Sequence, residues 1–364
     1  MARLNNQSSI YNFGAGPACL PEAVLNHIRE DIPHWHDGMS IMEISHRLPE
    51  FMALTETIEA NLRSLLAIPD DFAVLFMAGG ARTQFSVIPM NLLNGANTAD
   101  YIITGHWSNL ASKDAAKYCQ VHCVASTQSD GFTTVPQDSD LNFSENAPYV
   151  HYTDNETIQG VEFGHFPKTE KWLVSDMTSN ILTKTIDFSR IGLIYASAQK
   201  NLGIAGITVV IVRKSLLGKA HPFTPPTFDY TLCTENHSLM NTPPVFNWYV
   251  LGLVLEWVKQ QGGLKTLQQE VEQKAKLLYK LIDSSDFYTN PVASNARSRI
   301  NIPFRLPSEK LDSEFIAQAD KAGLKQLKGH KVVGGCRASF YNAMPLSGVQ
   351  ALCDFMRDFE KTHG

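Results

Sequence analysis

Two apolar runs joined by a short polar turn constrain this chain more than any other feature. Residues 194–206 read IYASAQKNLGIAG, and a second apolar run, residues 207–212 (ITVVIV), follows at once. Short apolar runs bounded by glycine are typical of buried strands. The turn between them carries Gln199 and Lys200, so we expect a lysine at the edge of a buried sheet. Desolvation raises the fraction of free amine on such a lysine, and the free amine can attack a carbonyl carbon.

The rest of the chain predicts a layered α/β fold. Further apolar runs alternate with segments of helical spacing, the runs covering residues 73–77, 101–104, 121–125, 149–152 and 172–175. This alternation favours a mostly parallel sheet with helices on both faces. In such sheets ligands bind at the carboxyl ends of the strands. The Gly79-Gly80 turn, Trp107, Asp176 and Lys200 all follow predicted strands, so we expect them to meet at one edge.

The C-terminal third predicts a second, smaller unit. Gly262-Gly263 interrupts the helical pattern, and a long amphipathic helix, a strand at residues 298–304 and further helices follow. A chain of 364 residues is long for one core. We therefore expect a large domain, residues 18–260, and a small α+β domain made of residues 1–17 and 261–364.

Composition argues against several classes of protein. The net charge is −5, so the chain has no basic field for nucleic acid or an anionic membrane. Residues 1–13 lack the apolar core of a secretory signal, and the longest apolar stretch, residues 246–258, is too short to span a bilayer. The six cysteines show no zinc-like spacing, so we expect reduced thiols, no metal and a cytoplasmic protein.

A strand-end lysine is usually a surface side chain whose stem packs on apolar neighbours, so a catalytic Lys200 needs partners. Pyridoxal phosphate is the usual electron sink for a lysine that forms a Schiff base. Its ring nitrogen needs a carboxylate, its ring face an aromatic side chain, and its phosphate the N–H groups of a helix start. The sequence offers Asp176, Trp107 and the Gly80-Ala81-Arg82 turn for these needs, with Thr157 and Gln199 as further donors. Taken alone, Asp176 is better explained as a helix cap, and Trp107 can be explained as a core residue.

Several longer motifs resemble the phosphoserine aminotransferases, which are fold-type-I pyridoxal-phosphate enzymes. They follow the family's order along essentially the whole chain: Ser45-His46-Arg47, residues 151–157 (HYTDNET), 198–201 (AQKN), 241–244 (NTPP), 328–335 (KGHKVVGG) and 337–345 (RASFYNAMP). The resemblance implies a large domain with a mostly parallel, seven-stranded type of sheet, a smaller C-terminal α+β domain, and a homodimer with shared active sites.

The resemblance also implies a role for each candidate residue. Lys200 forms the Schiff base and moves the proton during transfer, while Asp176 pairs with the ring nitrogen. The implied cofactor ligands are Ala81, Arg82, Trp107, Thr157 and Gln199, together with Asn241 and Thr242 from the other subunit. The implied substrate ligands are Arg337 for the α-carboxylate, and His46, Arg47, Arg82, His330 and Lys331 around the second anionic end. Independently, such a cluster in an acidic protein predicts a small substrate with two anionic ends.

The activity that the resemblance implies is reversible transamination between glutamate and 3-phosphohydroxypyruvate, giving 2-oxoglutarate and O-phosphoserine for serine biosynthesis. It further implies use of 3-hydroxy-2-oxo-4-phosphooxybutanoate, a substrate of vitamin B6 synthesis. The chain departs from the usual family pattern at Ala15, Ala81, Thr83, Ile204 and Lys331. A lysine in place of an arginine offers a point charge instead of a planar fork, so we expect Lys331 to affect substrate preference.

Two alternatives remain open at this stage. The first is another fold-type-I reaction, such as a different aminotransferase or a desulfurase. A desulfurase needs a mobile, reactive cysteine, and Cys336, which lies between the motifs at residues 328–335 and 337–345, is the only cysteine next to a site motif. The second alternative is a non-catalytic protein that binds the cofactor.

Overall fold

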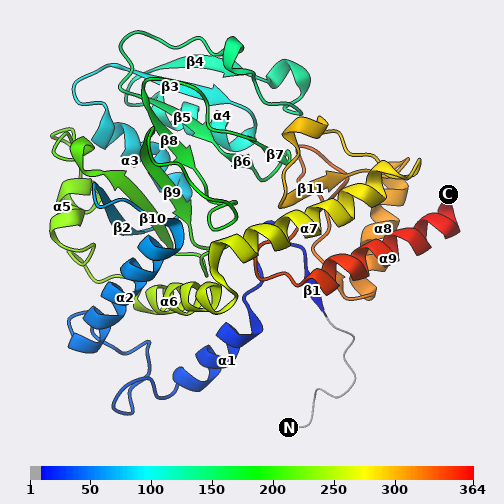
Figure 1. The fold of residues 1–364 in the computed structure, drawn as a ribbon, viewed down its shortest axis with the longest axis horizontal. Helices are drawn as coiled ribbons and strands as arrows, with labels where there is room; N and C mark the ends of the chain where they lie inside the picture. The colour runs from blue at the N-terminus through cyan, green and yellow to red at the C-terminus, as the bar shows by residue number, and fades with distance from the viewer. Residues whose placement is uncertain (1–9) are drawn as a thin grey trace.

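A seven-stranded sheet forms the centre of the molecule (Figure 1). This computed structural model describes residues 10–364. The strand order is β2-β10-β9-β8-β5-β3-β4, and β10 is the one strand antiparallel to its neighbours. The strands are β2 (Phe72–Ala78), β3 (Thr98–Ile103), β4 (Gln120–Ser126), β5 (Tyr149–Thr153), β8 (Trp172–Asp176), β9 (Ile191–Ser197) and β10 (Ile207–Arg213). The predicted mostly parallel sheet is confirmed.

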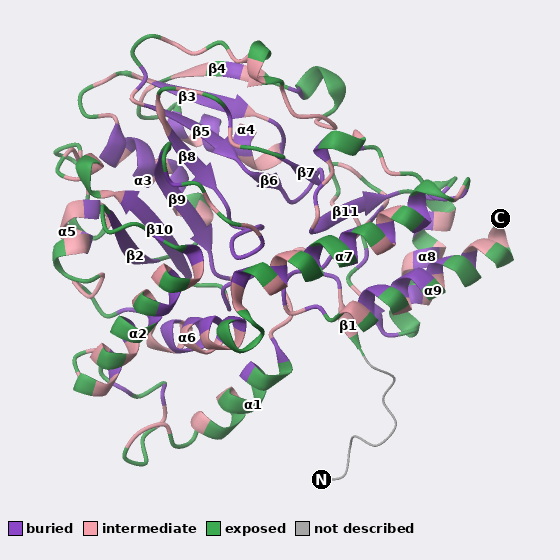
Figure 2. Ribbon diagram, viewed as in Figure 1, coloured by how far each residue is buried: buried purple, intermediate pink, exposed green. Residues whose placement is uncertain are grey.

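Helices cover both faces of this sheet. Side chains of α2 (Pro49–Leu66) and α6 (Val245–Gln260) form one apolar cluster with one face, and α1 (Glu22–Asp31) packs at its margin. Side chains of α3 (Ala81–Leu92), α4 (His106–Ala115) and α5 (Tyr230–Glu235) form a second cluster with the other face. Figure 2 shows the central strands as buried, and all seven residues of β9 are. Burial from both sides explains why the strands read as unbroken apolar runs.

The C-terminal part forms its own apolar cluster beside the sheet (Figure 1). Its elements are α7 (Gly263–Asp283), β11 (Asn301–Phe304), α8 (Glu309–Lys321), β12 (Leu324–Lys325), β13 (Cys336–Ser339) and α9 (Leu346–His363). β11 pairs with β13, and β12 pairs with β1 (Tyr11–Asn12) near the N-terminus. Helix α7 joins the two parts, because Leu264 and Leu267 pack in the sheet cluster whereas Leu278 and Leu281 pack in the C-terminal one.

We propose the same domain division for the folded chain as for the sequence: residues 18–260 as the large unit, and residues 1–17 with 261–364 as the small one. The pairing of β1 with β12 and the burial of Phe13 in the C-terminal cluster support this proposal. Residues 1–9 lie outside the described residues. The expectations for the first residues of the small unit, and for a secretory signal within residues 1–13, therefore fall largely on this part of the chain. Within residues 10–364, no helix is both long and apolar enough to cross a membrane.

One predicted strand is shorter in the structure than in the sequence analysis. The expected strand at residues 298–304 begins only at Asn301. The hydroxyl of Ser298 accepts hydrogen bonds from the backbone N–H groups of Ile300 (3.1 Å) and Asn301 (2.9 Å), which bends the chain before the ladder starts. Such local competition by serine with strand pairing is common at turns.

The turn at Gly160 offers a test of how the two parts pack. Gly160 has φ +73°, and an added Cβ would lie 2.6 Å from the carbonyl oxygen of Asn301 and still closer to the ring of Pro303. We expect Gly160→Ala to lower the free energy of unfolding by about 3 kcal/mol, because strain and overpacking combine there. Chemical denaturation checks this, with Gly164→Ala as control, since Gly164 is exposed and nothing lies within 4 Å of its added Cβ. Equal stability of the two variants would contradict the packing described.

Candidate active site

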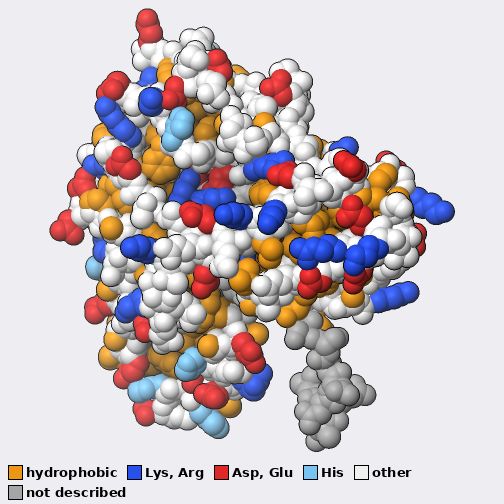
Figure 3. Space-filling view, turned by 45° about the vertical axis from the view of Figure 1, so that its right-hand side comes forward, with side chains coloured by type: hydrophobic (Ala, Val, Ile, Leu, Met, Phe, Trp, Pro, Cys, Tyr) orange, Lys and Arg blue, Asp and Glu red, His pale blue; other side chains and the backbone are white. Residues whose placement is uncertain are grey.

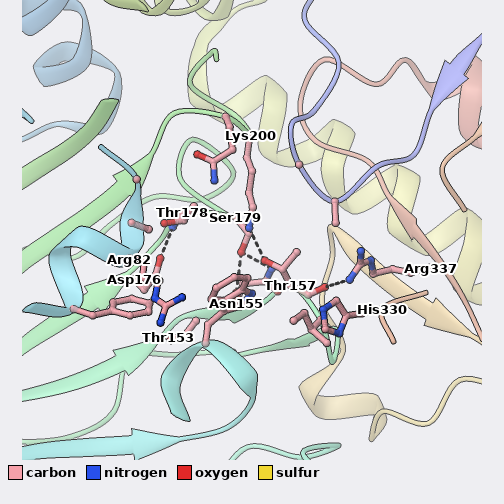
Figure 4. A pocket seen from close by; sticks show the side chains of 18 residues that line it. Arg82, Thr153, Asn155, Thr157, Asp176, Thr178, Ser179, Lys200, His330 and Arg337 are labelled. Carbon is pink, nitrogen blue, oxygen red and sulfur yellow. Dashed lines mark hydrogen bonds between the residues drawn. The ribbon is translucent and has the colours of Figure 1, made fainter. Parts of the chain in front are cut away.

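The parallel strands of the sheet end at a cavity of ≈ 460 Å³ that is bounded on one side by the C-terminal part. Asp176 is the last residue of β8, Thr153 is the last residue of β5, and Lys200 follows the end of β9. Trp107 comes from the first turn of α4, and His330 and Arg337 come from the C-terminal part. Figure 4 shows the side chains of Thr153, Asp176, Lys200, His330 and Arg337 around one space. The expected meeting of Gly80, Trp107, Asp176 and Lys200 at one edge is therefore observed.

Lys200 extends into this cavity and donates a hydrogen bond from Nζ to Thr157 Oγ1 at 2.5 Å (Figure 4). Burial lowers the pKa of Lys200 to about 8, and the nearby Arg337 cation acts in the same direction. The carboxylates of Asp176 and Glu156 oppose this shift. The result is an amine whose free fraction near neutral pH is far larger than that of an ordinary lysine, as the chemistry of a nucleophilic lysine requires.

The N-terminal segment covers the stem of Lys200. Gly16 has φ +133°, so a side chain at this position would strain the turn, and a Cβ added there would lie in van der Waals contact with Cγ of Lys200 at 3.5 Å. The backbone N–H of Ala18 donates to the carbonyl oxygen of Gln199 at 2.9 Å. Ala15, one of the departures from the family pattern, lines the cavity beside Gly16.

Asp176 is almost fully buried and held in place by the residues that follow it. The backbone N–H of Thr178 donates to Oδ1 of Asp176 at 2.9 Å. Burial raises the pKa of Asp176, while hydrogen bonds from Thr178 and attraction to Lys200 lower it. The hydroxyl of Tyr195 also approaches this carboxylate, and Nε2 of His151 lies 2.9 Å from that hydroxyl. The carboxylate is therefore fixed in orientation beneath the cavity.

The N-terminus of α3 faces the same cavity. Gly79 has φ +111° and Gly80 is extended, so the chain turns sharply from β2 into the helix. No side chain among residues 10–364 caps this helix, and Ala81 and Arg82 of its first turn line the cavity. Free N–H groups and the helix dipole favour an anion at such a place. The helix begins at Ala81, so Ala81 and Arg82 belong to its first turn.

Positive side chains gather on the side of the cavity opposite the sheet. Nη1 of Arg337 donates to the carbonyl oxygen of Thr157 at 3.3 Å, and the ring of His330 lies 5.8 Å from that of His106. Burial lowers the pKa of both histidines, and neighbouring cations add to the shift, Lys331 among them. Figure 3 shows Lys and Arg side chains across the middle of one face of the molecule.

The polar atoms of the cavity fit pyridoxal phosphate. Four buried atoms on its wall have no hydrogen-bond partner among residues 10–364: Thr153 Oγ1, Asn155 Oδ1, Trp107 Nε1 and Arg337 Nε. Buried polar groups are normally paired, so these atoms indicate a ligand with several polar substituents. The cavity also provides the four groups that this cofactor needs: a carboxylate, an aromatic ring, an uncapped helix start and a lysine of lowered pKa.

The structure does not bring all predicted site residues to this cavity within one chain. His46 and Arg47 lie in the loop between α1 and α2, and Asn241 and Thr242 lie just before α6, so the grouping of His46 and Arg47 with His330 is not formed in one chain. Lys331 is exposed beside His330. For Asn241 and Thr242 this position agrees with their expected source in another subunit, which stays a prediction.

Several wall residues were missed by the sequence analysis. Thr153, Asn155, Thr178 and Ser179 all line the cavity. Each is a short polar residue within three positions of the carboxyl end of β5 or β8. That placement after a buried strand is the signal that identifies them, because the carboxyl ends of parallel strands share one edge.

Comparison with known proteins identifies the class of enzyme. The sequence pattern of the family described as Aminotransferase class-V matches residues 10–352. A curated phosphoserine aminotransferase of Laribacter hongkongensis is 51% identical over 358 residues, covering 98% of this chain and 100% of that protein. The chain belongs to the phosphoserine aminotransferase family.

Solved structures of this family have the same fold. The phosphoserine aminotransferase of Bacillus circulans subsp. alkalophilus matches with a TM-score of 0.95 at 43% identity, covering 98% of this chain and 99% of that one. The PLP-bound phosphoserine aminotransferase of Trichomonas vaginalis matches with a TM-score of 0.92 at 38% identity, covering 96% and 99%. The predicted family, fold class and cofactor are confirmed, and the chain is a pyridoxal-phosphate-dependent aminotransferase.

The lowered pKa of Lys200 predicts how its attachment to the cofactor depends on pH. We expect the rate at which cofactor-free protein takes up pyridoxal phosphate to rise with pH and to level off above about pH 8, because only the free amine attacks. In Arg337→Gln the midpoint should move to higher pH, since Arg337 helps to lower the pKa. Stopped-flow absorbance measures both rates. A midpoint at about pH 10, as for an ordinary lysine, would contradict the described environment of Lys200.

Proposed function

We propose that this protein catalyses reversible amino-group transfer between glutamate and 3-phosphohydroxypyruvate, giving 2-oxoglutarate and O-phosphoserine. The observation that carries the proposal is the contact of Lys200 with Thr157 beside the buried Asp176, in a cavity that also holds Arg337 and His330. The identity to the curated relative supports the same substrates. Serine biosynthesis in the cytoplasm is the expected setting.

Pyridoxal phosphate, when bound, supplies an electron sink for negative charge that develops at the substrate α-carbon. We assign Asp176 to the ring nitrogen and Trp107 to the ring face. The first turn of α3 at Ala81 and Arg82 binds the phosphate. Thr157 and Gln199 complete the set with side-chain donors.

Lys200 is the residue that moves the proton. Its Nζ is held by the hydroxyl of Thr157, and burial lowers its pKa to about 8, which raises the fraction of free amine. A free amine at this position can accept a proton from one atom and return it to another, and a pKa close to the working pH suits both steps.

Arg337 and His330 provide the anion-binding side. One N–H group of Arg337 is used by the carbonyl oxygen of Thr157, which leaves its remaining donors for a carboxylate. We assign His330, Lys331 and Arg82 to the second anionic end; His330 and Arg82 line the cavity, and Lys331 is exposed beside His330. Lys331 and Ala15 are the departures most able to alter substrate preference, Lys331 through its charge geometry and Ala15 through a missing hydroxyl.

We infer that a second copy of the chain completes the site. Arg47, Asn241 and Thr242 are exposed in one chain and lie outside its cavity. In a two-fold dimer each copy supplies the same residues to the other. His46 and Arg47 would then contribute to the substrate anion site, and Asn241 and Thr242 to the cofactor phosphate, from the partner.

The alternative reactions find less support. A desulfurase needs an accessible thiol, whereas Cys336 is buried in β13 and burial raises its pKa. No cysteine in the described part of the chain lines the cavity. A non-catalytic binding protein has no need for the lowered pKa of Lys200 beside a fixed carboxylate.

The decisive assay compares acceptors in the presence of glutamate. We expect 3-phosphohydroxypyruvate to be aminated far faster than pyruvate, with 3-hydroxy-2-oxo-4-phosphooxybutanoate as a further acceptor, because the cavity offers two anion sites. Lys200→Ala should lose turnover by about 10⁴-fold and lose the absorbance of covalently bound cofactor. Lys274→Met is the matched control, since Lys274 is also buried but donates to the carbonyl oxygen of Met344 (2.9 Å) outside the cavity. Turnover by Lys200→Ala at the wild-type rate would refute the assignment.

A mixing experiment tests the shared site. Lys200→Ala and Arg47→Ala are each expected to be nearly inactive, but their mixed dimer should hold one intact site. After subunit exchange at equal amounts we expect recovery of about a quarter of wild-type activity. Lys200→Ala mixed with Arg337→Gln should recover nothing, because both residues line the cavity of their own chain. Equal recovery in the two mixtures, or none in either, would exclude a contribution of Arg47 from the partner.

A further inference from the structure

Glu156 is a fully buried carboxylate to which the reaction described above gives no role. It accepts three hydrogen bonds from the first turn of α4: from the backbone N–H of Trp107 at 3.0 Å, and from the backbone N–H and hydroxyl of Ser108 at 2.8 and 2.6 Å. Burial raises the pKa of Glu156 to about 7, and these hydrogen bonds oppose the shift. The side chain is thus aimed at a helix N-terminus, where negative charge is favoured.

The fit between Glu156 and the helix start is close. Gly105 precedes α4 in an extended conformation, with φ 177°. A Cβ added to Gly105 would lie 2.6 Å from Cγ of Glu156 and closer still to its carboxyl carbon. Glycine is therefore needed at this position for space rather than for backbone freedom, because any side chain would displace the carboxylate from the helix.

A short hairpin fixes the other end of this contact. Glu156 lies in β6 (Asn155–Glu156), which pairs with β7 (Val161–Glu162). Its carbonyl oxygen accepts a hydrogen bond from the backbone N–H of Gly160 at 2.9 Å. A second hairpin residue, Gln159, accepts from the backbone N–H of His106 at 3.1 Å. The hairpin thus holds the start of α4 at two points.

The two ends of the contact carry residues of the active site. Trp107, whose backbone Glu156 binds, lines the cavity with its ring, and Nε1 of this ring has no partner among the described residues. Thr157, the next residue after Glu156, accepts from Nζ of Lys200. Glu156 therefore links the two residues: its carboxylate binds the backbone of Trp107, and its neighbour in the chain, Thr157, contacts Lys200.

We propose that Glu156 is a positioning residue that holds the first turn of α4 against the β6–β7 hairpin and so sets the position of the Trp107 ring relative to Lys200. The proposal rests on the cofactor-binding site proposed above, in which Trp107 covers the ring face. A stacked ring gains most of its contact energy only at the right separation, so a small shift of α4 weakens binding even in a folded protein.

The test measures binding without covalent attachment. Pyridoxine 5′-phosphate has the ring and phosphate but no aldehyde, so Lys200 cannot react with it. We expect Glu156→Gln to raise the dissociation constant of this probe for cofactor-free protein by about tenfold or more, because an amide cannot accept all three hydrogen bonds. Quenching of tryptophan fluorescence reports the binding, and far-UV circular dichroism confirms the fold.

A matched control separates positioning from stability. Asp100 is also fully buried and accepts from the hydroxyl of Ser144 at 2.7 Å and from Nζ of Lys171 at 2.9 Å, but it does not line the cavity. Asp100→Asn should lower the melting temperature as Glu156→Gln does and change the dissociation constant less than about twofold. Equal loss of affinity in both variants would overturn the proposal, because Glu156 would then act only on stability.

A double-mutant cycle tests whether Glu156 acts through Trp107. In a Trp107→Ala background, Glu156→Gln should change the dissociation constant much less than in the wild type. An undiminished effect would overturn the proposal.

If Glu156→Gln fails to fold, Glu156→Asp, which keeps the charge and shortens the side chain, is tested in the same cycle. If the wild-type protein fails to bind the probe, the proposed cofactor-binding site itself is refuted. If the wild type and Lys200→Ala bind the probe and Glu156→Gln binds it with undiminished affinity, only the role of Glu156 is refuted.

Discussion

The burial of the Lys200 amine beside the Asp176 carboxylate is the interaction on which the rest of the site depends. Burial lowers the pKa of the lysine and raises that of the aspartate, so it favours the neutral form of each. Their mutual attraction has the opposite effect on both. A positive group that binds Asp176 from the cavity would weaken this attraction and release the amine from its charged state. The two residues are therefore poised to respond to a cationic ring placed between them.

This pair is possible because of how the chain crosses the sheet. Asp176 ends β8 and Lys200 follows β9, and these strands are adjacent and parallel, so their carboxyl ends lie side by side. The connection from β9 to β10 covers only residues 198–206. A parallel crossover needs a dozen or more residues, so β10 returns antiparallel and the Lys200 turn stays at the edge. The one antiparallel strand is thus the geometric consequence of placing a lysine in a short turn between two buried strands.

The same reasoning explains how much of the site was predictable from the sequence. Asp176, Trp107 and Lys200 could be placed together because each follows a buried strand, and strand ends of a parallel sheet meet. Residues that reach the cavity from the C-terminal part, such as Arg337, have no such rule, because their position depends on how the two parts pack. Glu156 was hidden for a different reason. Its role depends on a hydrogen bond to a helix start 49 residues away in sequence, and no local sequence pattern predicts that contact.

The large and the small part of the chain are joined by polar contacts that include residues of the cavity wall. Nδ2 of Asn155, on the cavity wall, donates to Oδ1 of Asn301 in β11 at 2.8 Å. Nδ2 of Asn301 donates to the hydroxyl of Tyr341 at 3.2 Å, and that hydroxyl donates to the carbonyl oxygen of Ala15 at 2.7 Å. β11 pairs with β13, which carries Arg337. The Asp176 carboxylate at the sheet edge and Arg337 in the C-terminal part are therefore held on opposite sides of one cavity, with the two parts joined by a hydrogen bond between the buried side chains of Asn155 and Asn301. Because such groups are costly to leave unpaired, relative movement of the two parts is penalised, and the spacing between the lysine side and the anion-binding side is fixed before any ligand arrives.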